Sequence, residues 1–192
     1  MKNTRLISFV LAAAVIGGFA CKKKEAPPAA VTEPGGQTIA ATVKTSRIAQ
    51  GYARKSTYFK LPDISGGDID LASHAGKPVL VMFFTETCPY CRKAAPFIEK
   101  VHLAYTKKGL NVVGICIQDD PEAPRGFARD LATTFSLAYK GRKIYKDYKA
   151  QGVPFIYLLD RNHEIHEMWG GYSPEYDAEI IAKVEEALTK PM

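Results

Sequence analysis

The apolar and polar positions of this 192-residue chain change period several times, and each change marks an expected element. A continuous apolar run from Val79 to Phe84 has the length and the β-branched and aromatic content of a buried central strand. Leu110–Ile117 predicts a second buried strand. Phe155–Leu159 predicts a third, which a turn connects to an antiparallel partner over Ile165–Trp169. A shorter strand is expected earlier in the chain, over Tyr58–Leu61.

Helical spacing dominates between these strands. Apolar residues recur at helical intervals from Cys88 to about Lys108, and Gly109 is expected to end that helix. A second helix is expected over residues 123–134 and a short one over Arg142–Tyr148. The pair Ser173-Pro174 is typical of a helix N-cap and first position, so the last helix is expected to begin there.

The first 20 residues differ from the rest of the chain. Lys2 and Arg5 precede an apolar stretch that is too short for a membrane span, so residues 1–20 are predicted to be a secretory signal peptide. Cys21 follows directly, and its position resembles that of the lipidated cysteine of bacterial lipoproteins. Gly18 and Phe19 depart from the usual lipoprotein pattern. Ordinary signal cleavage and an uncleaved anchor are therefore the alternatives to lipidation.

Residues 21–55 are predicted to form a flexible, lipid-anchored tether and an N-terminal extension, followed by the folded domain over residues 56–192. Proline, glycine, alanine and charged residues dominate residues 22–37, where no apolar period exists. Thr38–Val43 has the pattern of an edge strand. Removal of the signal leaves 24 basic and 20 acidic residues, a net charge of +4. That weak excess gives no reason to expect nucleic-acid binding.

The central strand leads into Cys88 and Cys91, which stand in a Cys-Pro-Tyr-Cys frame. Cys88 is expected at the start of a helix, where unpaired backbone N–H groups and the helix dipole stabilise a thiolate, the reactive form of cysteine. Arg92 and Lys93 add positive charge nearby. Cys91 lies one turn further, close enough to form a disulfide with Cys88. The spacing therefore predicts a redox dithiol.

A zinc site is the main alternative for such a cysteine pair. A structural zinc site needs a second pair of ligands, and the other cysteines, Cys21 and Cys116, stand in unsuitable contexts. The four histidines show no zinc-finger spacing. Cys116 lies inside a predicted strand and is expected to be a small core residue with no catalytic role. We expect neither a metal ion nor a cofactor at the Cys88–Cys91 pair.

Four features resemble the thioredoxin superfamily, in particular the TlpA-like and ResA-like thiol–disulfide oxidoreductases of bacterial cell envelopes. They are the strand into Cys88-Pro89-Tyr90-Cys91, Pro96 behind it, the segment Gly152-Val153-Pro154-Phe155, and the lead-in from Phe59 to Ile64 with Gly76-Lys77-Pro78. Together they span about residues 57–190. The resemblance implies an α/β thioredoxin-like fold, a central mixed sheet flanked by helices. It also implies a cis-proline, Pro154, opposite the N-terminus of the cysteine helix.

The resemblance further implies disulfide exchange with protein substrates, with Cys88, Cys91 and Pro154 as the catalytic residues. Cys88 would attack and Cys91 would resolve the mixed disulfide. The implied substrate-binding residues are Thr87, Pro89, Tyr90 and Val153. A reductant role of the cytochrome c maturation kind is implied, with a membrane electron donor of the DsbD or CcdA type. An oxidant or isomerase role stays open. The implied location is the bacterial cell envelope, facing the periplasm, with a lipid anchor at Cys21.

Three positions depart from the family pattern. Thr87 replaces the tryptophan that usually precedes the first cysteine. Met82 and Ala94 stand where thioredoxins and ResA-like proteins, respectively, carry an acid near the buried thiol. Glu86 is the nearest carboxylate in sequence and is expected to face solvent. The sequence therefore does not identify a side chain that accepts the proton of Cys91.

Two rival functions resemble parts of this pattern. Residues 85–89 resemble Sco-type copper chaperones, which place three residues between their cysteines and use a distal histidine. His163 and His166 are the candidates for that histidine, but both are expected to be solvated beside a hairpin turn and dispensable. The other rival is a peroxiredoxin, whose reactive cysteine stands in a Pro-x-x-x-Thr-x-x-Cys setting. The complete setting is absent here.

Overall fold

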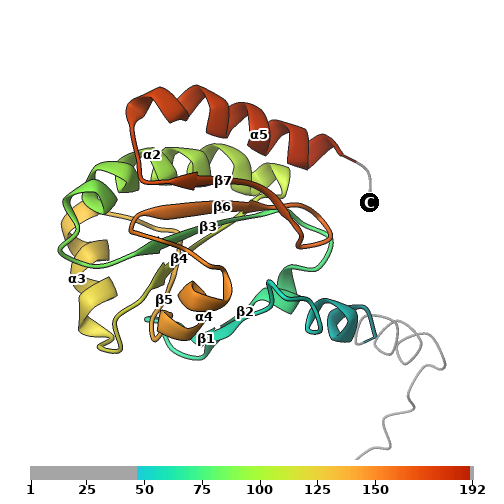
Figure 1. Cartoon of the computed structure of the whole chain (residues 1–192), viewed down its shortest axis with the longest axis horizontal. Helices are drawn as coiled ribbons and strands as arrows, with labels where there is room; N and C mark the ends of the chain where they lie inside the picture. Colours follow the sequence, from blue (N-terminus) through green and yellow to red (C-terminus); the bar gives the residue numbers. More distant parts are fainter. Residues whose placement is uncertain (1–46, 191–192) are drawn as a thin grey trace, which may run out of the picture. The chain divides into compact units, whose positions relative to one another are not determined.

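The computed structural model describes residues 47–190 and has a five-stranded mixed sheet at the centre of the domain (Figure 1). The strand order is β5-β4-β3-β6-β7, so β3 is the middle strand. β3, β4 and β5 are parallel, whereas β6 is antiparallel to both β3 and β7. The strands are β3 (Val79–Phe84), β4 (Asn111–Cys116), β5 (Ser136–Ala138), β6 (Phe155–Leu159) and β7 (Ile165–Gly170).

Helices cover both faces of this sheet, which confirms the predicted α/β, thioredoxin-like architecture. One face carries α2 (Pro89–Tyr105), α3 (Glu122–Leu131) and α5 (Asp177–Thr189). The other face carries α4 (Arg142–Asp147) and a small hairpin of β1 (Lys60–Pro62) and β2 (Asp68–Asp70). Within residues 47–190, every helix is too short or too polar to cross a membrane.

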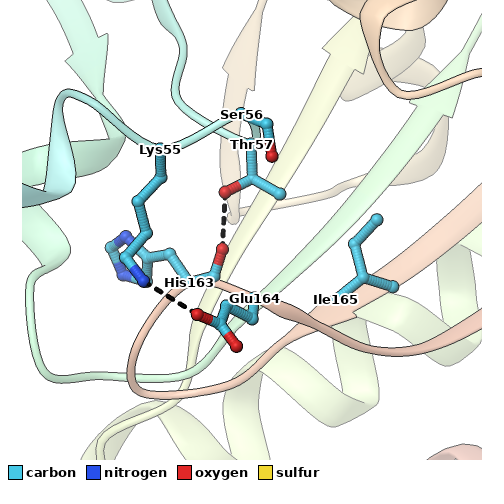
Figure 2. Close-up of a pocket in the computed structure, with 6 residues that line it drawn as sticks. All are labelled: Lys55, Ser56, Thr57, His163, Glu164 and Ile165. Atoms are coloured by element: carbon cyan, nitrogen blue, oxygen red, sulfur yellow. Dashed lines mark hydrogen bonds and ion pairs between the residues drawn. The ribbon is translucent and has the colours of Figure 1, made fainter.

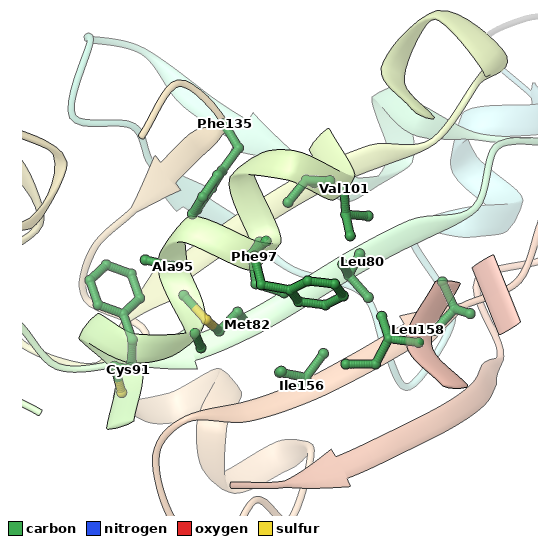
Figure 3. Close-up of a cluster of buried hydrophobic side chains, with 14 of the residues drawn as sticks. Leu80, Met82, Cys91, Ala95, Phe97, Val101, Phe135, Ile156 and Leu158 are labelled. Carbon is green, nitrogen blue, oxygen red and sulfur yellow. The ribbon is translucent and has the colours of Figure 1, made fainter. Parts of the chain in front are cut away.

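The middle strand, β3, is buried on both faces. All six of its side chains are fully buried, and they alternate between the two cores of the domain. Leu80 and Met82 face α2 and pack with Phe97 in the cluster that Figure 3 shows. Val81 and Phe83 face the β1–β2 hairpin and α4. Because both faces are covered, β3 appears in the sequence as an unbroken apolar run.

Helix α2 begins directly after the loop that follows β3. Cys88 is its N-cap residue, in an extended conformation, and Pro89 occupies the first position, where a missing N–H has no consequence. The helix ends in a 3₁₀ turn, Thr106–Lys108, and Gly109 adopts the left-handed conformation that this ending requires, with φ of 104°. The predicted helix from Cys88 to Lys108 is therefore confirmed.

Other predicted boundaries differ from the structure. Strand β5 was not predicted, because three residues are too short to show a period. Ser173 caps a 3₁₀ turn, Pro174–Tyr176, and α5 itself begins only at Asp177. The edge strand predicted over Thr38–Val43 lies outside the described residues, as does Cys21.

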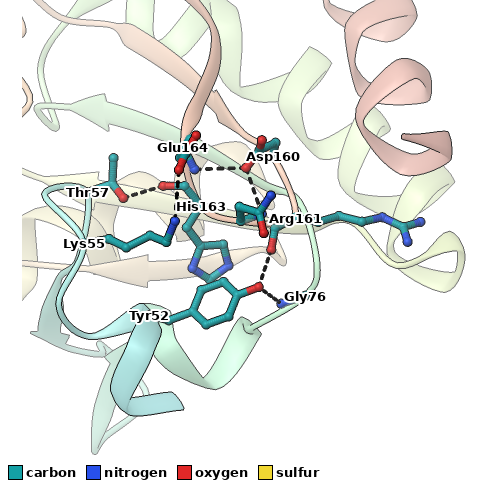
Figure 4. Close-up of polar contacts among 9 residues, drawn as sticks. Tyr52, Lys55, Thr57, Gly76, Asp160, Arg161, His163 and Glu164 are labelled. Atoms are coloured by element: carbon teal, nitrogen blue, oxygen red, sulfur yellow. Dashed lines mark hydrogen bonds and ion pairs between the residues drawn. The ribbon is translucent and has the colours of Figure 1, made fainter. Parts of the chain in front are cut away.

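The residues that precede β1 are attached to the turn between β6 and β7 (Figure 4). The hydroxyl of Tyr52 donates a hydrogen bond to the carbonyl of Arg161 at 2.7 Å and accepts one from the N–H of Gly76 at 3.1 Å. Its ring meets the His163 ring edge-on, with centroids 4.5 Å apart. These contacts join segments that are about one hundred residues apart in the sequence.

A small cavity of about 230 Å³ lies beside this attachment (Figure 2), lined by Lys55, Ser56, Thr57, His163, Glu164 and Ile165. The ammonium group of Lys55 pairs with Glu164 at 3.1 Å, and the Thr57 hydroxyl donates to the His163 carbonyl. The β6–β7 turn follows Leu159, which pairs with the first residue of β3. Cys88 follows the last residue of β3, so this cavity lies at the opposite end of the sheet from the cysteines.

The prediction that His163 and His166 are solvated is wrong. His163 is only 1% exposed, with a positive φ of 58° and its Nε2 3.2 Å from the His74 carbonyl oxygen. His166 is half-buried, with its Nε2 3.4 Å from a Glu186 carboxylate oxygen. Burial lowers the pKa of His163, and this effect outweighs the hydrogen bonds to the backbone of His74 and Lys77, which act in the opposite direction. The turn looks exposed in the sequence because the segment that covers it is distant along the chain.

The lowered pKa of His163 predicts a loss of stability in mild acid. Histidine in an unfolded chain titrates near pH 6.5, so below that pH the unfolded state binds more protons at this site than the native state. The stability that neutral His163 contributes above about pH 6.5 is therefore lost as the pH falls through its native pKa. We expect the free energy of unfolding to fall more between about pH 7.5 and pH 5 in the wild type than in His163→Asn.

Urea unfolding at each pH measures this difference. Asparagine is chosen because it tolerates the positive φ at this position. His102→Asn, on α2, is the control and is expected to keep the wild-type pH dependence. Equal pH dependence of stability in the wild type and His163→Asn would contradict the role of burial at His163.

Candidate active site

The two predicted cysteines meet at the N-terminus of α2 with different exposure. Cys88 is half-buried, whereas Cys91 is fully buried. Both are free thiols in the structure. The backbone N–H of Cys91 donates to the Cys88 sulfur at 3.3 Å. This donor is one of the unpaired N–H groups of the first helical turn, so the helix start directly contacts the sulfur of Cys88.

Burial raises the pKa of the Cys91 thiol well above the usual cysteine range, and its interaction with Cys88 adds to this effect. A backbone hydrogen bond from Thr85 acts in the opposite direction. Met82 and Ala94 are fully buried in the same cluster, and neither side chain can accept a proton. Figure 3 shows Cys91 beside Met82 at the end of this cluster. Desolvation therefore favours the neutral thiol of Cys91.

Pro154 and Val153 lie opposite the cysteines. The Val153–Pro154 peptide bond is cis, and Pro154 is buried at the start of β6. The Cys88 thiol donates to the Val153 carbonyl oxygen at 3.4 Å. The Pro154 carbonyl accepts from the N–H of Gly171 at 2.9 Å, which joins the two ends of the β6–β7 hairpin beside the cysteines. The structure therefore brings Cys88, Cys91, Val153 and Pro154 together.

The residues around the cysteine frame differ in exposure. Thr87, Pro89 and Tyr90 are exposed, and Tyr90 has one of the most exposed large side chains of the described part, at 58%. The ammonium group of Lys93 lies 5.3 Å from the centre of the Tyr90 ring. Arg92 instead forms an ion pair with Asp130 at 2.9 Å, so a carboxylate on α3 offsets its charge. Within residues 47–190, Lys93 has no carboxylate at ion-pair distance, so its charge is not offset as that of Arg92 is.

Gln118 is a site residue that sequence reasoning missed. Its side-chain oxygen accepts a hydrogen bond from the Glu86 N–H at 2.9 Å and a weaker one from the Cys116 thiol at 3.6 Å. Glu86 belongs to the loop that carries Thr85 and leads to Cys88. The carboxylate of Glu86 is half-buried against Gly126 of α3, so the expectation that it faces solvent holds only in part. No local sequence signal marks Gln118, because its stronger partner, the Glu86 N–H, lies 32 residues away in the loop after β3.

Cys116 is fully buried at the end of β4, and burial raises the pKa of its thiol to about 11. Among residues 47–190, no three His, Cys, Asp or Glu side chains are grouped to hold a metal ion. His163 is separated from Pro154 by the whole of β6, ~16 Å for five strand residues. The placement of His163 therefore argues against the copper-chaperone reading, in which it would be the distal ligand of Cys88 and Cys91.

The fold and the cysteine pair together define a thioredoxin-like protein with the first cysteine of the pair at a helix N-cap. The chain belongs to the AhpC/TSA family, because its residues 53–186 match the sequence pattern of that family. The thiol–disulfide oxidoreductase ResA of Bacillus thuringiensis is 26% identical over 133 residues, 68% of this chain and 77% of that protein. A Mycobacterium tuberculosis protein provisionally named a peroxiredoxin is 35% identical over 130 residues, 67% of this chain and 68% of that protein.

Solved structures give the same result for the fold. A Chlorobium tepidum protein provisionally named as the thiol:disulfide interchange protein DsbE has a TM-score of 0.66 and 24% identity, covering 70% of this chain and 95% of that one. A Bacteroides thetaiotaomicron protein provisionally named a protein disulfide isomerase has a TM-score of 0.65 and 27% identity. The match covers 69% of this chain and 87% of that one. The predicted resemblance to ResA-like proteins of thioredoxin fold is therefore confirmed.

The contacts of Gln118 predict a measurable role in holding the loop before Cys88. Gln118→Met removes the acceptor of the Glu86 N–H, and we expect the free energy of unfolding to fall by about 1 kcal/mol. Gln118→Glu keeps an acceptor oxygen and should lose less. Urea unfolding at neutral pH measures both variants. Equal stability of Gln118→Met and the wild type would show that water replaces this contact without loss.

Proposed function

We propose that this protein exchanges disulfides with protein substrates through Cys88 and Cys91, and that it acts as a reductant in the bacterial cell envelope. The observation that carries the proposal is the position of the Cys88 sulfur. It is half-exposed at the start of α2 and 3.4 Å from the Val153 carbonyl oxygen, while its partner Cys91 is buried. This arrangement leaves one sulfur accessible to a substrate and one protected.

In the proposed reduction, the Cys88 thiolate attacks one sulfur of a substrate disulfide. The substrate S–S bond breaks, a mixed disulfide forms, and the first substrate thiolate leaves and takes up a proton. Cys91 then loses its proton and attacks the Cys88 sulfur. The Cys88–Cys91 disulfide forms and the second substrate thiolate leaves. Two electrons pass from the dithiol to the substrate, so a membrane dithiol donor of the DsbD or CcdA type must restore the reduced pair.

The backbone beside Cys88 is suited to an extended substrate. Among residues 47–190, the N–H of Val153 has no hydrogen-bond partner, and its carbonyl contacts only the Cys88 thiol. A substrate segment can therefore pair with Val153 as an added strand while its cysteine faces Cys88. Pro154 has no N–H that would compete for the backbone of the substrate. Around Cys88, the exposed residues are Thr87, Pro89 and Tyr90. This pairing supports protein segments, rather than small thiols, as the substrates.

Met82 and Ala94 occupy the positions at which thioredoxins and ResA-like proteins carry an acid, so neither position supplies a carboxylate for the resolving step. A reductant needs a potential near that of thioredoxin, about −270 mV, whereas a strong oxidant lies near −120 mV. Equilibration of the Cys88–Cys91 pair with glutathione gives this potential and decides the direction. A reduction potential near that of a strong oxidant would overturn the proposed reductant role and indicate that the pair oxidises its substrates.

Peroxide reduction is the second candidate function, favoured by the M. tuberculosis relative of 35% identity. Thr85 stands three residues before Cys88, as in the peroxiredoxin setting, although Val81 replaces the proline of that setting. In this reaction the Cys88 thiolate would take one oxygen from hydrogen peroxide and release hydroxide, which becomes water. Cys91 would then form the disulfide and release a second water. Peroxide consumption by the reduced protein distinguishes the two functions.

The cysteine variants provide the main test of the proposed exchange. Cys88→Ser is expected to abolish disulfide reduction, because it removes the accessible sulfur. Cys91→Ser should accumulate a mixed disulfide between Cys88 and the substrate, visible by mass spectrometry, because the resolving sulfur is absent. Cys116→Ser is the matched control and should keep its activity. Disulfide reduction by Cys88→Ser, or iodoacetamide labelling of Cys91 before Cys88 in the wild type, would overturn the assignment.

We also propose that residues 1–20 are a signal peptide, that Cys21 is lipidated, and that residues 21–55 tether a domain over residues 56–192. The charged start, the short apolar core and the position of Cys21 support this organisation. The contacts of Tyr52 and Lys55 with the β6–β7 turn indicate that the last part of the tether packs on the domain. The lipid would hold the enzyme at the membrane, facing the periplasm.

Membrane fractionation tests the anchor. The wild-type protein is expected in the membrane fraction and to be released by detergent. Cys21→Ala should appear in the soluble periplasmic fraction or remain unprocessed, because it lacks the lipidated thiol. Cys116→Ser again serves as the control. A soluble wild-type protein would show that the signal is cleaved without lipidation.

A further inference from the structure

A continuous hollow runs along the surface beside the cysteines. Three adjoining cavities of about 330, 280 and 490 Å³ form it, and each shares lining residues with the next. The first and second share Val153, Pro154, Gly170 and Gly171. The second and third share Tyr90, Tyr172 and Ser173. The hollow therefore leads from the backbone that faces Cys88 to a region between α2 and the segment after β7.

The far part of this hollow has aromatic walls. Tyr90 of α2 and Tyr172, which follows β7, both line it, and Tyr176 lines the adjoining middle part. Tyr172 is held in place, because its hydroxyl donates to Asp177 at 2.9 Å and its ring stacks on Phe97 at a centroid distance of 6.0 Å. Tyr90 is exposed and has no such support. Aromatic side chains of this kind are typical anchors of binding surfaces, since they offer a large apolar area at a small entropic loss.

The geometry of an extended chain places a particular substrate residue in this region. Side chains in a strand alternate between its two faces, so a substrate cysteine that faces Cys88 has the residues two positions away on the same side. If the segment pairs with Val153 and continues along the hollow, one of these two residues reaches the space between Tyr90 and Tyr172. The adjacent residues point away from the protein.

We infer that the hollow between Tyr90 and Tyr172 is a specificity site for a large aromatic side chain, two residues from the reactive cysteine of an extended protein substrate. The inference rests on the proposed disulfide exchange and adds the class of substrate sequence. Its volume, about 490 Å³ at the widest part, falls in the range of about 300–1,000 Å³ that accommodates bound groups. A planar ring can stack on the fixed Tyr172 ring while Tyr90 closes over it.

Lys93 offers a competing mode of recognition at the same place. It lines the widest part of the hollow, and no carboxylate lies within ion-pair distance of its ammonium group in residues 47–190. A single exposed cation attracts a carboxylate only weakly in water. Tyr90 and Tyr172 line the same part of the hollow and offer a large apolar area, so the aromatic side chain is the favoured occupant.

Peptides with one cysteine, blocked as a mixed disulfide with thionitrobenzoate, test this inference in the purified, reduced protein. Attack by Cys88 releases the coloured thiolate, and the rate of this release is measured for each peptide. The peptides carry Trp two residues before the cysteine, Trp two residues after it, or Glu at either of these places. A reference peptide has Ala at both places. We expect one of the two Trp peptides to react about tenfold faster than the Ala peptide. In Tyr90→Ser and Tyr172→Ser this ratio should fall to about twofold or less.

Two further variants sharpen the result. Tyr172→Phe keeps the ring and should retain most of the preference. Leu103→Ser changes a residue of α2 that is 65% exposed and far along the helix, and it should keep the wild-type ratio. Tyr90 is itself exposed, so Tyr90→Ser remains informative if Tyr172→Ser fails to fold.

The outcomes separate this inference from the function on which it rests. No Cys88-dependent release from any peptide would overturn both. Release from the Ala peptide with equal rates for the Trp peptides would overturn only the aromatic site. A preference for the Glu peptide that Lys93→Gln removes would replace it with recognition by charge. If the preference for Trp persists in both Tyr90→Ser and Tyr172→Ser, the Trp side chain binds elsewhere and the inferred site is wrong.

Discussion

The burial of β3 on both faces is the constraint on which the rest of the structure depends. Its six side chains are divided between two cores, so the strand cannot shift by one residue without exchanging the two sets. Its last residue, Phe84, fixes where the following loop begins, and the loop places Cys88 at the N-cap of α2. The sulfur of Cys88 accepts a hydrogen bond from the Cys91 N–H of α2 at 3.3 Å and donates one to the Val153 carbonyl at 3.4 Å, and the second bond joins α2 to the segment that leads into β6.

This position gives the two thiols different chemistry from the same helix turn. Cys88 is accessible and receives a backbone N–H, whereas Cys91 is desolvated and its pKa is raised. The neighbouring side chains, Met82 and Ala94, give no acid to take the Cys91 proton. A hydrogen bond from the backbone of Thr85 lowers this pKa, as does one from the cysteine's own backbone. The loop before Cys88 therefore affects both cysteines, which explains why the contact of Gln118 with that loop matters.

The two ends of the sheet have separate roles. The end that carries Cys88 also carries the hollow lined by Tyr90 and Tyr172, while the opposite end receives the chain from its N-terminal side through Tyr52. Residues 47–55, the described residues before position 56, therefore pack at the end of the sheet that lies away from Cys88.

The sequence by itself determined β3, the Cys88–Cys91 pair at a helix start, and the family, because each depends on residues that are neighbours along the chain or in one helical turn. The end of the helix at Gly109 could be predicted for the same reason. The tertiary structure alone decided that His163 is buried, that Gln118 holds the loop before Cys88, and that Tyr172 and Tyr90 line one cavity. The hydrogen-bonded partners are far apart in the sequence, by 32 positions for Glu86 and Gln118 and by 106 for Thr57 and His163. Period and motif report local burial, but they contain no information about which distant surface covers a given residue.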